Sequence, residues 1–283
     1  MNPNLGLQLW SVRNALQENY VDTLEKIAAI GYQNLELITT VTDQGLVFGK
    51  DLTASQLQRH LTDTGLRAVS CHIVPQPGMN WEAVVANLQE LGVKHLGCAI
   101  AFFSNKQDVL DFCKPFNRDA EFCKKNGIQY YYHNHFHEFQ IFEGQSIMDI
   151  MMENLDKDLV MFEFDSYWAM RGGQDPVAWI RKLGKRCDLL HQKDMPASAK
   201  PVNWFDQFGA DASYGFDQLL ESVKGNDQFT EVGEGVMDIP AIIEASRTYG
   251  PARYMFVEQD KSARGELDSI TVSFANLVKM LNA

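Results

Sequence analysis

A repeated unit runs along the chain and strongly limits what it can fold into. Four glycines, at positions 31, 65, 92 and 127, each open a short apolar run. Before each glycine lies a segment with helical spacing of apolar residues, such as Val21, Leu24 and Ile27. Because glycine tolerates positive φ, it is the residue expected just past a helix end. Each unit therefore predicts a helix, a glycine and a short buried strand.

The apolar runs are too short and too uniformly apolar for strands with one wet face, so buried parallel strands fit them better. Eight such strands can be counted, with a helix after each, at 5–9, 34–38, 67–73, 95–100, 128–133, 159–165, 187–193 and 254–259. Eight units in 283 residues predict an α/β fold, a single (β/α)8 TIM barrel domain over 1–283. An open doubly wound sheet is the alternative, weakened because no GxGxxG follows the first strand. A long ordered loop is expected at about 195–237.

Charge and composition limit the classes of partner and the cellular compartment that we expect for this chain. The net charge is −12, and the densest basic runs are RKLGKR (181–186) and KK (124–125), so we expect no nucleic-acid binding. No apolar run approaches the roughly 18 residues that span a membrane, and the first residues lack the pattern of a signal peptide. Five scattered cysteines without CxxC spacing read as reduced thiols. Together these features predict a cytoplasmic protein.

Barrels of this kind place their chemistry at the C-terminal ends of the strands. Four successive expected strands end in His133, Asp165, His191 and Glu258. A mixed set of imidazoles and carboxylates suits a borderline divalent cation such as Mn²⁺, Co²⁺, Zn²⁺ or Fe²⁺. Plainer roles stay open for three of these residues. Asp165 could open a turn, His191 could be a hydrogen-bonded core histidine, and Glu258 could be a surface carboxylate.

Other strand ends offer substrate contacts. Trp10 stands at the end of the first expected strand and could contact a substrate. Glu36 and His72 end the second and third expected strands, although a salt bridge or simple filling of the barrel mouth would explain them equally well. Lys193 shares a strand face with His191 because side chains alternate.

The stretch YYYHNHFHEF at 130–139 needs separate treatment. By the same alternation, His133 and His135 face one side of the strand. His137 and Glu138 lie beyond it, so we expect His137 to face solvent or to back up the site. Glu138 could fold back as a ligand or as an acid/base group.

Sequence motifs at the expected strand ends, taken in order along the whole chain, resemble those of a known family. LGLQLWSVRN, YYYHNHFHEF, FEFDSYWAMRGGQDP, LLHQKD and FVEQD resemble the strand ends of xylose-isomerase-like barrels. That superfamily includes sugar (phosphate) isomerases and epimerases, inosose dehydratases and the endonuclease IV group. The resemblance implies one divalent cation, such as Mn²⁺, Co²⁺, Zn²⁺ or Mg²⁺, held by Glu, Asp, His and Glu.

Three of those ligand positions correspond to Asp165, His191 and Glu258. The first has histidine where many members have glutamate, which leaves His133 and Glu138 as alternatives for the fourth ligand. An endonuclease role would need more histidine ligands and a basic DNA face, and neither is evident.

The chemistry implied by the resemblance is proton abstraction next to a carbonyl, through an enediolate. Glu258, or a base near His133, would remove the proton, and Lys193 would stabilise the oxyanion or act as an acid. The leading hypothesis is a metal-dependent isomerase or epimerase acting on a small carbohydrate. A dehydratase acting on a keto-sugar or inosose is the first alternative, and a carbohydrate-binding barrel without catalysis is the second. A homodimer is expected by analogy only.

Overall fold

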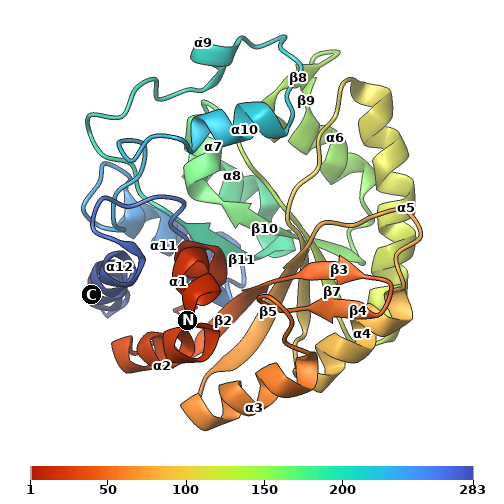
Figure 1. Ribbon diagram of the computed structural model, residues 1–283. Helices are drawn as coiled ribbons and strands as arrows, with labels where there is room; N and C mark the ends of the chain where they lie inside the picture. The colour runs from red at the N-terminus through yellow and green to blue at the C-terminus, as the bar shows by residue number, and fades with distance from the viewer. Residues whose placement is uncertain (1, 283) are drawn as a thin grey trace.

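Eight parallel strands form a closed barrel with helices around it (Figure 1). The computed structural model describes residues 2–282. Around the barrel the strands follow the order β1-β12-β11-β10-β7-β6-β5-β2. They are β1 (Asn4–Gln8), β2 (Asn34–Ile38), β5 (Arg67–Ile73), β6 (His95–Cys98), β7 (Gln129–His133), β10 (Val160–Asp165), β11 (Cys187–Gln192) and β12 (Tyr254–Val257). The closed barrel confirms the predicted (β/α)8 fold.

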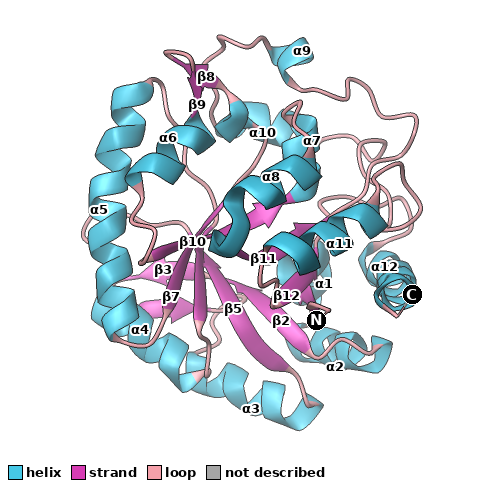
Figure 2. Ribbon diagram, turned by 180° about the vertical axis from the view of Figure 1, so that it is seen from behind, coloured by secondary structure: helices cyan, strands magenta, loops and turns pink. Residues whose placement is uncertain are grey.

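Helices occupy the outside of the barrel, as the view from behind shows (Figure 2). They are α1 (Arg13–Glu18), α2 (Tyr20–Ile30), α3 (Ala54–Thr64), α4 (Trp81–Glu90), α5 (Lys106–Lys125), α6 (Ile147–Asn154), α7 (Ser166–Arg171), α8 (Pro176–Leu183), α9 (Phe205–Phe208), α10 (Phe216–Ser222), α11 (Ile239–Tyr249) and α12 (Glu266–Leu281). Two small hairpins are added, β3 (Thr40–Thr42) with β4 (Gly45–Val47) and β8 (Ile141–Phe142) with β9 (Gln145–Ser146). Among the described residues, no helix has the length and apolarity to cross a membrane.

The repeat is explained by the way its helices begin and end. The four repeat glycines have φ between 70° and 117°, a conformation that costs other residues strain. At the other end of α3, Thr53 forms a capping box with Gln56 and satisfies the first helical N–H groups. Between the helices, strand residues such as Leu35 and Leu37 are fully buried. Helix, glycine and buried strand therefore follow each other for local physical reasons.

A layer of apolar side chains fills the barrel interior below the site. Tyr131, Leu189 and Phe256 pack together there, each no more than 1% exposed. Gly6 makes room for this layer, because a Cβ there would lie 2.5 Å from the Phe256 ring. Side chains alternate along a strand, so the residue two positions after each of these three also points inward. Those residues are His133, His191 and Glu258.

The segment expected as a long ordered loop, 195–237, contains α9 and α10 and is held by one buried carboxylate. Asp194 accepts hydrogen bonds from the backbone N–H groups of Met195, Gly233, Gly235 and Met237, at 2.8–3.1 Å. Asp194, two residues past the end of β11, thereby positions the loop.

Candidate active site

Strand register brings the four predicted metal ligands together. Asp165 of β10 aligns with His191 of β11, and Glu163 of β10 aligns with His133 of β7. The Glu258 N–H donates to the Gln192 carbonyl at 3.1 Å, which extends the β11–β12 pairing by one step. His133, Asp165, His191 and Glu258 each offer a ligand atom, and these atoms lie within 4.8 Å of one another. We call these residues the four-residue set.

The four-residue set fits a divalent cation. Nitrogen and oxygen ligands lie roughly 2.0–2.2 Å from zinc, so two of them can be up to about 4.4 Å apart, close to the spacing here. The buried Nδ1 of His133 has no hydrogen-bond partner. Burial, followed by the charge of His191, holds the pKa of His133 well below its usual value. A neutral imidazole with an unpaired nitrogen is what a metal ligand requires.

Lys193 places a second positive charge among the same carboxylates. Its Nζ lies 2.9 Å from Asp165 Oδ2, contacts Glu258 Oε2, and lies 3.6 Å from Asp260 Oδ2. Burial alone would lower the pKa of Lys193, but Asp165, Glu258 and Asp260 outweigh it and raise that pKa. Lys193 therefore stays protonated, and its positive charge partly offsets the negative charge of the three carboxylates.

His191 is held from two sides by carboxylates. Its Nδ1 lies 2.8 Å from Glu258 Oε2, and its Nε2 lies 2.5 Å from Glu36 Oε2. Gln8 Nε2 donates to the same Glu36 oxygen at 2.8 Å. Glu36, predicted as a substrate contact, is fully buried behind His191. A carboxylate in that position fixes the orientation of a histidine ligand.

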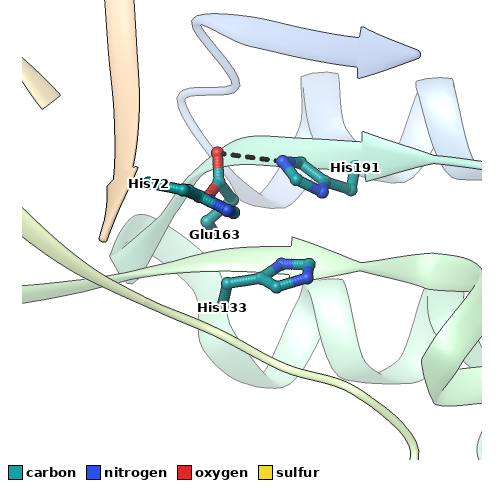
Figure 3. A group of neighbouring side chains, drawn as sticks. All are labelled: His72, His133, Glu163 and His191. Atoms are coloured by element: carbon teal, nitrogen blue, oxygen red, sulfur yellow. Dashed lines mark hydrogen bonds and ion pairs between the residues drawn. The ribbon is translucent and has the colours of Figure 1, made fainter. Parts of the chain in front are cut away.

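Glu163 is a member of the site that sequence reasoning missed. Its Oε2 lies 2.5 Å from His72 Nε2, and its Oε1 lies 3.4 Å from His191 Nε2. Figure 3 shows His72, His133, Glu163 and His191 converging inside the barrel; they form a second group able to hold a cation. The signal was present, because Glu163 lies two residues before Asp165 and so shares its inward face.

Glycine on β6 permits this second group. A Cβ at Gly97 would lie 2.6 Å from His72 Cδ2 and 3.1 Å from Glu163 Oε2. Such distances leave no room for a side chain, so the His72–Glu163 pair packs directly against the β6 backbone.

A cavity of about 340 Å³ opens onto these groups. His133 and Glu258 from the four-residue set line it, together with His72 and His135. Burial lowers the pKa of His135 to about 3, so its imidazole is neutral. Trp10 lies at the rim, 42% exposed, with its indole N–H donating to Asp260 Oδ1 at 3.1 Å. The cavity is thus lined by five of the predicted contact residues. They are Trp10 at the rim and, at or just past the ends of β5, β7 and β12, His72, His133, His135 and Glu258.

Glu138 lies outside this cavity. Its carboxylate accepts from the Tyr132 hydroxyl at 2.6 Å and from the His135 N–H at 2.8 Å, on the far side of β7. His137 lies 3.2 Å from Glu138 and is 1% exposed. The expectation that His137 faces solvent is therefore wrong, because its ring is buried between Glu138 and the Ala101 carbonyl.

Known proteins are similar to this chain, either in sequence over a short segment or in fold over its whole length. The inosose dehydratase of Geobacillus kaustophilus (strain HTA426) is 33% identical over 79 residues, which are 28% of this chain and 25% of that protein. The match thus spans about a quarter of that relative's length.

Solved structures match over nearly the whole chain. A sugar phosphate isomerase/epimerase from Parabacteroides distasonis ATCC 8503 has a TM-score of 0.75 at 25% identity, covering 98% of this chain and 94% of that one. The IOLI protein with a bound zinc atom has a TM-score of 0.70 at 13% identity, covering 100% and 98%, which is a likeness of fold. Residues 24–271 match the family described as xylose isomerase-like TIM barrel. Because that match spans most of the barrel, the chain belongs to the xylose isomerase-like TIM barrel family.

Proposed function

We propose that this protein is a divalent-metal-dependent isomerase or epimerase. Its substrate would be a sugar, a sugar phosphate or a ketone derived from a polyol. The observation that carries the proposal is the four-residue set, two of whose members, His133 and Glu258, line the cavity. Similarity to a sugar phosphate isomerase/epimerase supports the substrate class.

The cation would be held by His133, Asp165, His191 and Glu258. When bound, a divalent ion supplies Lewis-acid polarisation of a carbonyl oxygen. The donor set suits Mn²⁺, Co²⁺ or Zn²⁺ better than Mg²⁺, which prefers oxygen ligands. The IOLI protein, which is similar in fold, binds a zinc atom, and this supports a divalent metal as the cofactor.

Glu258 is the proposed base. It lines the cavity, and although burial would raise its pKa, Lys193 and His191 lower that pKa more strongly, so the carboxylate stays ionised. It would take the proton from the carbon beside the carbonyl and return it to the neighbouring carbon. For epimerisation, proton transfer would have to occur on opposite faces of the same carbon. His135 lines the cavity just past the end of β7, and its neutral imidazole would act as the base on that face.

Lys193 is the proposed stabiliser of negative charge. Its raised pKa favours this role over that of a proton donor, because the ammonium does not release its proton near neutral pH. The charge that develops on the substrate oxygen would then form in a buried site already supplied with a fixed cation.

Deuterium exchange tests the proposal. The metal-loaded protein is incubated in D₂O with a panel of ketoses, and the unreacted substrate is analysed by mass spectrometry. We expect deuterium at the carbon beside the carbonyl, exchange that stops with EDTA, and loss of exchange in Glu258→Gln. No exchange with any ketose would reject the isomerase mechanism.

A dehydratase is the second candidate, and the local identity with an inosose dehydratase favours it. Both reactions share the first proton abstraction, but a dehydratase then expels a β-hydroxyl as water. Products from the same incubation separate them, because only the dehydratase yields an unsaturated ketone that is lighter than its substrate by one molecule of water. The third hypothesis, a binding barrel without catalysis, predicts ligand binding without exchange or product.

A further inference from the structure

The cavity has two chemically different ends. Its floor carries the polar groups described above, whereas its mouth is apolar. Ile38 and Ile73 are the last residues of β2 and β5, and Val74, Ala99 and Ile100 follow β5 and β6. Phe216, Leu219, Leu220 and Val223 come from α10 and the residue after it. Both ribbon views show α10 beside α7, at the end of the barrel where β10 leads into α7 (Figures 1 and 2).

Exposed apolar side chains are concentrated at this mouth. Among residues 2–282, eight large apolar side chains are more than a third exposed. Four of them line the cavity: Trp10, Val74, Phe216 and Leu220, which are 42%, 48%, 58% and 50% exposed. Scattered exposed apolar residues need no explanation, but a group around a polar site marks a surface that a ligand covers. We call these four residues the apolar wall.

The cavity lacks what a phosphate group requires. Among the described residues that line it, none is lysine or arginine. Lys193 does not line the cavity, and its Nζ contacts Asp165 and Glu258 at the floor, away from the apolar mouth. At the rim, Arg13 stacks on Trp10, with Cζ 4.5 Å from the ring centroid, and donates to the carbonyls of Trp10 and Asp260. Phosphate recognition commonly relies on cationic side chains, and the side chains that line this cavity supply none.

From this division we infer that the substrate is a carbohydrate ketone bearing an apolar substituent, and no phosphate, with the substituent against the apolar wall. The inference rests on the proposed function, which places the ketone at the floor. The reacting carbon then lies beside Glu258 and His133. A phenyl ring or short alkyl chain on the other end extends toward Phe216 and Leu220, and α10 covers it.

Matched glycosides test the inference without requiring turnover, because they carry the apolar substituent on a sugar ring in which a hydroxyl group takes the place of the ketone. Methyl and phenyl glycosides of glucose, galactose, mannose and xylose, with glucose 6-phosphate beside glucose, are titrated into the metal-loaded protein by calorimetry. Burying a phenyl ring should tighten binding about tenfold or more over the methyl glycoside for at least one sugar. Glucose 6-phosphate should bind no more tightly than glucose.

A double variant tests whether the preference for the phenyl group arises at the apolar wall. Phe216→Ser/Leu220→Ser should bring the phenyl-to-methyl affinity ratio to within about twofold. Ile141→Ser is the matched control, because Ile141 is 58% exposed and lies outside the cavity; it should keep the full ratio. Light scattering on the same samples tests the other occupant of such a wall, a second copy of the chain.

The possible outcomes separate the two proposals. The substrate inference is overturned if no phenyl glycoside binds more tightly than its methyl partner, or if the phosphate ester binds more tightly than the free sugar. It is also overturned if the double variant dissociates a dimer and leaves the ratio unchanged. Metal-dependent exchange in D₂O without a phenyl preference would reject this inference alone. A phenyl preference without any exchange would instead count against the proposed isomerase.

Discussion

His191 occupies the position where two groups of carboxylates meet. One ring nitrogen faces Glu258, on the cavity side, and the other faces Glu36 and Glu163 below. Burial would lower the pKa of His191, but Glu163, Glu36 and Glu258 outweigh it and raise that pKa well above its usual value. A bound cation would replace the proton on the cavity side, while Glu36 would continue to hold the other nitrogen. Glu36 and Glu163 would thus orient the His191 ring without binding the metal themselves.

Glu138 is expected to stabilise the fold without binding metal. Glu138→Ala would leave the buried Tyr132 hydroxyl and His135 N–H unpaired, so we expect the free energy of unfolding to fall by about 2–4 kcal/mol. Glu138→Gln keeps an acceptor and should lose less. Urea unfolding followed by circular dichroism measures both variants, and an unchanged midpoint in Glu138→Ala would contradict this role.

The pH dependence of that loss follows from the pKa shifts of the pair. Burial would raise the pKa of Glu138, but His137 lowers it below the ordinary 4.5, so its contribution is present above that pH and lost as pH falls. Burial would lower the pKa of His137, but Glu138 raises it above 6.5, so its contribution is present below 6.5 and lost as pH rises. The difference between wild type and Glu138→Ala should therefore be largest between about pH 4.5 and 6.5. A difference that grew steadily toward pH 9 would contradict the pairing.

The sequence anticipates which side chains gather at the strand ends, because His133, Asp165, His191 and Glu258 each stand where an apolar run ends. Their role as metal ligands stays a prediction. Glu163 was missed because it lies inside the apolar run MFEF. The sequence does not show that its buried carboxylate pairs with His72 on another strand. The side of the strand on which Glu138 lies depends on the 3₁₀ turn at His137–Phe139, which alternation cannot describe.

At the scale of elements, the loop that carries α10 depends on Asp194. Removing its carboxylate in Asp194→Ala would leave four backbone N–H groups without an acceptor. We expect amide hydrogen exchange across 233–237 to accelerate by about tenfold or more, since each lost bond to a charged group costs about 1.5–3 kcal/mol. Asp211→Ala, an exposed aspartate in the same loop, is the control. Equal exchange in the two variants would show that the loop is held by other contacts.

The eight strands and their helices were predictable because the signals are local. Periodicity, helix caps and the repeat glycines each act within a few residues, and they give the barrel when counted along the chain. The hairpins β3–β4 and β8–β9 and the helices α9 and α10 were not predicted. They are short, and their order comes from contacts with distant residues, such as Arg171 over the Trp204 ring at 4.2 Å.

For the molecule as a whole, the barrel explains how four ligands from four strands can be held rigidly. No two residues of the four-residue set are close in sequence, but β7, β10, β11 and β12 are successive barrel strands, and the curvature of the barrel turns their inward faces toward one another. Each strand is anchored below by the apolar layer and outside by helices. Metal binding should therefore raise the unfolding temperature of the entire molecule, because an ion that binds only the folded state stabilises it.

Metal content of purified variants tests the central claim most directly. Each protein is loaded with Zn²⁺, desalted and analysed by inductively coupled plasma mass spectrometry, with circular dichroism to confirm folding. Wild type and Glu138→Ala should hold about one ion per chain, whereas His133→Ala and Asp165→Ala should hold almost none. Full metal retention in folded His133→Ala and Asp165→Ala, or loss of metal in folded Glu138→Ala, would contradict the four-residue set as the metal site.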